Sequence, residues 1–262
     1  MELSFEAFGV SVMVGVEDPA LVGAVMEALP PGWKAIQGRE PVARVVLGRA
    51  SDGTYQIVVD DETTGLAVSA VQALQLLDAK LRITVAAHAP EFVFIHAGVV
   101  ALGDKVLVLP GRSFSGKSTL VEALLRAGAT YYSDEYAVLG RDGRVHPYAK
   151  PLSRRPAGSL RDRGIVETEE VDPRSLGAGI GAVPLPISLI ACATYRSGAR
   201  WAPRSLGPGE SALALVQHAV AARTDPERVL AHIRRAAEGC GAVEGERGEA
   251  EETAALLVGT IR

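Results

Sequence analysis

Residues Gly111 to Ser118 have the types and the spacing of a phosphate-binding loop. They read G-R-S-F-S-G-K-S and match the pattern G-x-x-x-x-G-K-[ST]. The two glycines allow a backbone in which successive N–H groups turn toward an anion. Lys117 in such a loop reaches the β- and γ-phosphates, and the Ser118 hydroxyl is a ligand for Mg²⁺. We therefore predict that a nucleoside triphosphate is bound by Gly111, Arg112, Ser113, Phe114, Ser115, Gly116, Lys117, Ser118 and Thr119.

The segments on either side of the loop support this interpretation. "KVLVLP" predicts a strand that enters the loop, and "TLVEALLRAG" predicts a helix that leaves it. The N-terminus of that helix adds the positive end of its dipole to the loop. A glycine-rich turn without a ligand is the alternative, and the order strand, loop, helix favours a phosphate loop.

An acidic pair follows the next predicted strand, which begins at Thr130. Asp134 and Glu135 lie shortly after the loop in the sequence "ATYYSDEYAVLG". A bound Mg²⁺–triphosphate needs a carboxylate near the loop, and a kinase needs one to orient or deprotonate the attacking hydroxyl. An adjacent acidic pair can supply both roles, and Ser118 and Glu135 are the candidate metal ligands. The alternative is a solvated turn, in which Asp and Glu are common.

His96 lies in the apolar sequence that precedes the loop. "EFVFIHAGVVALGDKVLVLPG" predicts two strands joined at Gly103-Asp104, so the strand that enters the loop pairs antiparallel with the one before it. A single histidine in an apolar stretch is most often structural, and a catalytic role is the other possibility.

These elements together resemble the HPr kinase/phosphorylase family and its smaller kinase-like relatives. The resemblance covers residues 92 to 139, with "FIHAGVV", the loop and "YYSDEYAVL". It implies an α/β fold with a mixed sheet, a P-loop kinase domain related to the nucleotide-binding core of phosphoenolpyruvate carboxykinase. It further implies that Gly111, Gly116 and Lys117 bind ATP, that Asp134 acts on a substrate serine and that His96 belongs to the active site.

The sequence also departs from that family. Glu135 replaces an aspartate, Thr119 replaces a glutamate, and the later arginine-glycine signature of the reverse phosphorolysis reaction is not found. The resemblance therefore implies the ATP site rather than HPr as the substrate. Some smaller relatives phosphorylate a serine of a precursor peptide, so we expect a peptide or small protein as acceptor. A small-metabolite kinase, or a nucleotide-sensing or ATPase module without an acceptor, remains the alternative.

The segment 140–188 is rich in glycine, proline and charge, and is long for a connection without structure of its own. Its cations are candidates to stabilise the transition state or to hold an acidic substrate. A solvated loop is the third possibility. In its basic stretch "HPYAKPLSRRPAGSLRDRG" the candidates are Lys150, Arg154 and Arg155, of which Lys150 and Arg154 lie closest to the acidic pair.

The remainder of the chain predicts a small α+β unit over residues 1–86, with a helix over 65–81, in front of the P-loop domain at 87–262. The 262 residues carry a net charge of −4, which argues against nucleic acid or an anionic membrane as partner. Two cysteines fit a reducing compartment, and no uninterrupted apolar run has membrane-spanning length. We expect a cytoplasmic protein, and its oligomeric state is left open.

Overall fold

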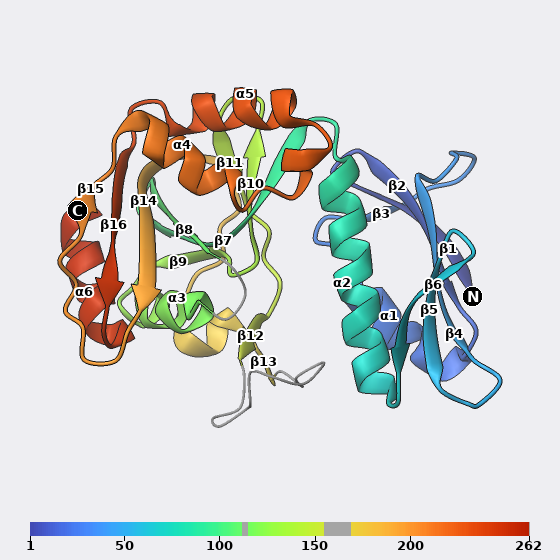
Figure 1. The fold of residues 1–262 in the computed structure, drawn as a ribbon. Coiled ribbons are helices and arrows are strands. Elements are labelled where there is room, and N and C mark those ends of the chain that lie inside the picture. Colours follow the sequence, from blue (N-terminus) through green and yellow to red (C-terminus); the bar gives the residue numbers. More distant parts are fainter. Residues whose placement is uncertain (112–114, 155–168, 262) are drawn as a thin grey trace. The chain divides into compact units, whose positions relative to one another are not determined.

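The computed structural model describes residues 1–111, 115–154 and 169–261, which form two compact units (Figure 1). The first unit contains Met1–Glu91, and the second contains the described residues from Phe92 onward. The division falls between residues 91 and 92, whereas the sequence placed it between 86 and 87. The difference arises because the helix that ends the first unit runs on to His88.

The first unit is a six-stranded sheet with its helices on one face (Figure 1). Leu77, Leu81 and Val85 of the long helix are fully buried, and they cover the apolar face of the sheet. The strand order is β3-β1-β2-β4-β5-β6. The elements are β1 (Glu2–Ala7), β2 (Val10–Val16), η1 (Pro19–Leu21), α1 (Val22–Ala28), β3 (Lys34–Ala35), β4 (Ala43–Arg49), β5 (Tyr55–Val59), β6 (Glu62–Ala67) and α2 (Ala70–His88).

The helix expected over 65–81 begins later than the sequence suggested. Asp60 and Asp61 both have positive φ and form a tight turn, which returns the chain as β6 antiparallel to β5. Gly65 to Ala67 therefore belong to a strand. The helix starts only after Ser69, whose side chain accepts a hydrogen bond from the backbone N–H of Gln72.

The second unit is built on an eight-stranded mixed sheet, so the α/β class with mixed sheets is confirmed. β7 (Phe92–Leu102) and β8 (Lys105–Pro110) form the expected antiparallel hairpin. β14 (Leu185–Tyr195) and β16 (Gly241–Arg247) extend the sheet beyond β8 by parallel pairing. The remaining strands are β9 (Thr130–Ser133), β10 (Tyr136–Gly140), β11 (Arg144–His146) and β15 (Arg204–Ser205), with β12 (Leu152–Arg154) and β13 (Glu169–Val171) as a separate pair.

Helices cover this sheet on both faces, with a hydrophobic core in each layer (Figure 1). α3 (Lys117–Arg126) and α6 (Ala250–Ile261) pack together over one core, and α4 (Pro208–Val216) and α5 (Pro226–Ala237) pack over the other. The apolar run of β8 is buried throughout because its side chains enter both cores.

The 3₁₀ turn η3 (Val220–Arg223) follows α4. The segment 140–188 contains, in its described part, three short strands and the 3₁₀ turn η2 (Pro173–Leu176). Within the described ranges, no helix is both long and apolar enough to cross a membrane.

Candidate functional site

The phosphate-loop sequence joins β8 to α3 in the second unit, in the order strand, loop, helix that the sequence predicted. Gly111 directly follows β8, and its backbone N–H donates to the carbonyl of His96 at 3.2 Å. Gly116 caps α3 in the left-handed conformation, with φ of 83°, which favours glycine. Arg112, Ser113 and Phe114 lie outside the described residues.

The side chains of the loop are arranged around its own backbone. The ammonium of Lys117 donates to the carbonyl of Gly111 at 2.8 Å, which folds the side chain back across the loop. The hydroxyl oxygen of Ser115 is buried and has no hydrogen-bond partner among the described residues. A buried hydroxyl without a partner is unfavourable unless a ligand completes it. Thr119 is exposed on the first turn of α3.

Asp134 lies in the turn between β9 and β10 and contacts the start of α3. Its Oδ2 accepts from the Ser118 hydroxyl at 3.2 Å and from the backbone N–H of Ser153 at 3.2 Å. Its Oδ1 lies 2.9 Å from the phenol oxygen of Tyr131. The residue is only 8% exposed. The structure thus brings together the two predicted residues Ser118 and Asp134, which are 16 positions apart in the sequence.

Burial raises the pKa of Asp134 to about 6, and the nearby charge of Glu135 acts in the same direction. The hydrogen bonds from Tyr131, Ser153 and Ser118 favour the carboxylate and oppose that shift. Removal from water is therefore the dominant effect on this group. A carboxyl group with this pKa is mostly ionised at neutral pH and is a stronger base than an exposed aspartate.

Tyr131 is a neighbour of the acid that the sequence did not single out. Its phenol oxygen lies 2.9 Å from Asp134 and also 2.9 Å from the carbonyl oxygen of Lys150. A phenol has one proton, so it donates to only one of these two acceptors at a time. Burial, followed by the charge of Asp134, raises the pKa of Tyr131, so the phenol stays protonated. The alternation of side chains along a strand is the sequence signal for this position, because it places Tyr131 and Tyr132 of β9 in opposite cores.

His96 and Glu135 form a second predicted pair. The Nδ1 of His96 lies 3.7 Å from a carboxylate oxygen of Glu135, and both side chains are about one-third exposed. His96 is paired with Tyr136 in the β7–β10 register, and the two rings are 4.8 Å apart. The candidate residues therefore form two groups in the described structure, Ser118 with Asp134 and His96 with Glu135.

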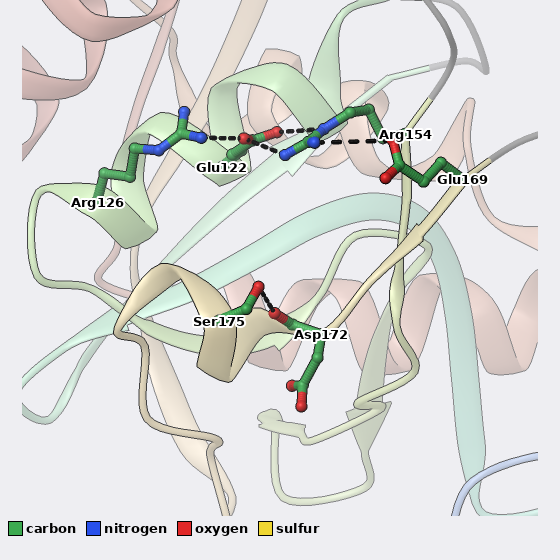
Figure 2. A network of polar contacts seen from close by, with 6 residues as sticks. All are labelled: Glu122, Arg126, Arg154, Glu169, Asp172 and Ser175. Atoms are coloured by element: carbon green, nitrogen blue, oxygen red, sulfur yellow. Dashed lines mark hydrogen bonds and ion pairs between the residues drawn. The ribbon is translucent and has the colours of Figure 1, made fainter.

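The predicted cations of segment 140–188 have separate positions. Arg154 forms ion pairs with Glu122 of α3 and Glu169 of β13, and Glu122 also binds Arg126 (Figure 2). Lys150 enters the site through its backbone carbonyl, the acceptor close to Tyr131. Arg155 lies outside the described residues. In this arrangement Arg154 joins β12 and β13 to the helix that follows the phosphate loop.

Comparison with known proteins adds no relative to these findings. No protein-family model matches the chain, and a search of curated proteins finds no match. The resemblance to the HPr kinase/phosphorylase family therefore stays a prediction from the residues.

Proposed function

We propose that the second unit is an ATP- and Mg²⁺-dependent kinase that transfers the γ-phosphoryl group to a hydroxyl. A serine of a peptide or small protein is the proposed acceptor. The observation that carries the proposal is the contact between Ser118 of the phosphate-loop helix and the buried Asp134, at 3.2 Å. It joins a phosphate-binding element to a carboxylate of suitable basicity.

The loop residues fit a polyphosphate. The left-handed Gly116 opens the N-terminus of α3, whose first N–H groups have no partner within the helix. The unsatisfied hydroxyl of Ser115 lies in the same loop, and Lys117 supplies a cation. We assign ATP phosphates to these residues, and Mg²⁺ to Ser118 with Glu135. When bound, the metal would neutralise charge on the transferring phosphoryl group.

In this proposal Asp134 is the base. It would accept the proton of the acceptor hydroxyl, while the hydroxyl oxygen forms its bond to the γ-phosphorus and ADP leaves. Tyr131 would orient the carboxylate from its other oxygen. His96 and Glu135 would flank the same turn, with Glu135 at the metal. Lys150 and Arg154, held beside the site, are the proposed contacts for the acceptor, together with Arg155.

The antiparallel β7 next to β8 supports a relation to HPr kinase and phosphoenolpyruvate carboxykinase, which we propose as the fold family. Two free cysteines, Cys192 and Cys240, agree with a protein of the cytoplasm.

The test is to locate the label after incubation with Mg²⁺ and γ-labelled ATP, with lysate fractions separated by mass. Label on a peptide or small protein, lost in Lys117→Ala, is the expected result. Lys105→Ala is the matched control, because Lys105 begins β8 and donates to the carbonyl of Ile261 at the far end of the strand. Label on a metabolite would show that the acceptor is a small molecule and not a peptide. Label only in free phosphate would refute transfer to a hydroxyl of an acceptor.

A further inference from the structure

Arg247, the last residue of β16, lies against the phosphate loop although it is 131 positions from Gly116 in the sequence. Its Nη2 donates to the carbonyl of Gly116 at 2.8 Å, and its Nη1 donates to the carbonyl of Gly248 at 2.9 Å. The ring of Tyr195 lies 5.2 Å from the guanidinium carbon. Arg247 is only 2% exposed, so both contacts are made away from water.

This guanidinium is a buried cation without a carboxylate in hydrogen-bond contact. Within the described residues, no Asp or Glu forms an ion pair with Arg247, and its Nε is buried without a hydrogen-bond partner. Arg126, Arg154 and Arg204, by contrast, all pair with glutamates. Burial lowers the pKa of Arg247 from the usual arginine value. The negative charges of Glu249 and Glu251 act in the opposite direction, without a hydrogen bond or ion pair to the guanidinium. A buried charge is unfavourable unless opposite charge compensates it, and the guanidinium lies beside the proposed phosphate loop.

The contact of Arg247 with the Gly116 carbonyl also determines the direction of the backbone N–H of Lys117. The carbonyl of Gly116 and the N–H of Lys117 belong to one planar trans peptide group, so they point in opposite directions. The carbonyl accepts two bonds, from Arg247 and from the backbone N–H of Leu120 at 3.2 Å. Fixing the carbonyl from this side therefore aims the Lys117 N–H out of the helix N-terminus, where an anion binds.

Gly116 fits this contact closely. A Cβ added at Gly116 would lie 2.5 Å from the Nη2 of Arg247, which is closer than such atoms approach. The backbone at Gly116 is also left-handed. The left-handed backbone therefore favours glycine at this position, and the missing Cβ leaves room for the guanidinium of Arg247.

We propose that Arg247 is a positioning residue for the polyphosphate of the nucleotide. It fixes the peptide between Gly116 and Lys117, and it adds a second positive charge beside the loop. The inference rests on the nucleotide-binding part of the proposed function and does not depend on phosphoryl transfer. It assigns Arg247 to the phosphates rather than to the base or the ribose.

The test compares the Kd of ATP with the Kd of inorganic triphosphate, measured by calorimetry for wild type, Arg247→Met and Arg247→Lys. We expect Arg247→Met to raise both Kd values about tenfold or more, and by similar factors, since charged hydrogen-bonding groups near phosphates contribute at this level. Arg247→Lys keeps the charge without the planar fork, so it should bind with intermediate affinity. Arg196→Met is the matched control, because Arg196 is exposed and neighbours Arg247 across the strands.

A purely structural role would lower the unfolding midpoint and leave both Kd values of the folded protein unchanged, which would overturn the proposal. Weaker binding of ATP with unchanged binding of triphosphate would overturn it as well, in favour of a base or ribose contact. If Arg247→Met does not fold, Arg247→Lys decides, and wild-type affinity in that variant refutes the inference. A wild type that binds ATP but transfers no phosphate would refute the kinase proposal alone.

Discussion

Replacement of Asp134 by asparagine should raise the stability of the second unit, although it removes the proposed catalytic base. The ordinary pKa of aspartate is 3.8, and burial raises that of Asp134 to about 6. Each pKa unit corresponds to about 1.4 kcal/mol, so the buried carboxylate destabilises the folded protein by about 3 kcal/mol when it is ionised. Asparagine has nearly the same shape and no charge. We expect Asp134→Asn to be the more stable protein at neutral and alkaline pH.

The hydrogen bonds around Asp134 accommodate an amide. With its nitrogen in the place of Oδ1, the amide donates to the phenol oxygen of Tyr131, whose proton then goes to the carbonyl of Lys150. The amide oxygen, in the place of Oδ2, accepts from Ser118 and from the backbone N–H of Ser153. No partner is lost, so the charge is the main quantity that changes.

The pH dependence has a definite sign. The folded pKa lies above the unfolded one, so the folded wild type binds more protons between about pH 4 and about pH 6. Its stability relative to the asparagine variant therefore falls as the pH rises through that window. The two proteins should have equal free energies of unfolding below about pH 4, and that of the variant should be higher by about 3 kcal/mol above about pH 7.

Urea unfolding at several pH values measures this difference. The chain has two tryptophans, so Trp33→Phe leaves Trp201 as a fluorescent reporter in the second unit. Asp142→Asn is the matched control for the substitution itself, because it makes the same change at a side chain that is exposed in a turn. A difference that does not vary with pH, or a wild type that is more stable at alkaline pH, would refute the argument from burial.

Three further substitutions follow from the same structure. Gly116→Ala should lower the free energy of unfolding by roughly 1–2 kcal/mol and weaken ATP binding, because φ at this residue is 83° and the added Cβ would meet Arg247. Wild-type affinity for ATP, measured by calorimetry, would contradict this. Tyr131→Phe should lower kcat about tenfold or more while the KM for ATP stays unchanged, since one contact to Asp134 is lost. Tyr132→Phe, which loses only a bond to a loop carbonyl, should leave kcat unchanged, and equal effects of the two would refute the assignment. Gly259→Ala, at an exposed helical position with open space around it, should raise stability by up to about 1 kcal/mol in thermal unfolding.

Local sequence patterns predicted the elements that bear the site. The hairpin of β7 and β8 was predicted from the turn residues Gly103-Asp104 between two apolar runs, and the helix after the loop from its apolar spacing. These signals are local, because turn residues and hydrophobic period act over a few positions. The helix expected over 65–81 is present, but its expected start at Gly65 was wrong, because a two-aspartate turn, which requires positive φ, has no strong local signature.

Local patterns do not predict contacts between residues that are far apart in the sequence. The sequence contained Ser118, Asp134, His96 and Glu135 as candidates, but not which of them meet. Arg247 gave no signal, since its contact with the loop depends on the parallel pairing of β14 with β8 and β16. The pairing of strands far apart in the chain is set by the packing of the whole sheet.

The most direct test of the central claim is phosphoryl transfer by Asp134→Asn under saturating Mg²⁺–ATP, with the labelled acceptor fraction as substrate. We predict that the variant binds ATP with a Kd within about threefold of wild type, while transfer falls by about a thousandfold or more, because the base is removed and the loop is kept. Transfer at the wild-type rate by a variant that binds ATP normally would contradict the account, because Asp134 would then have no part in the chemistry.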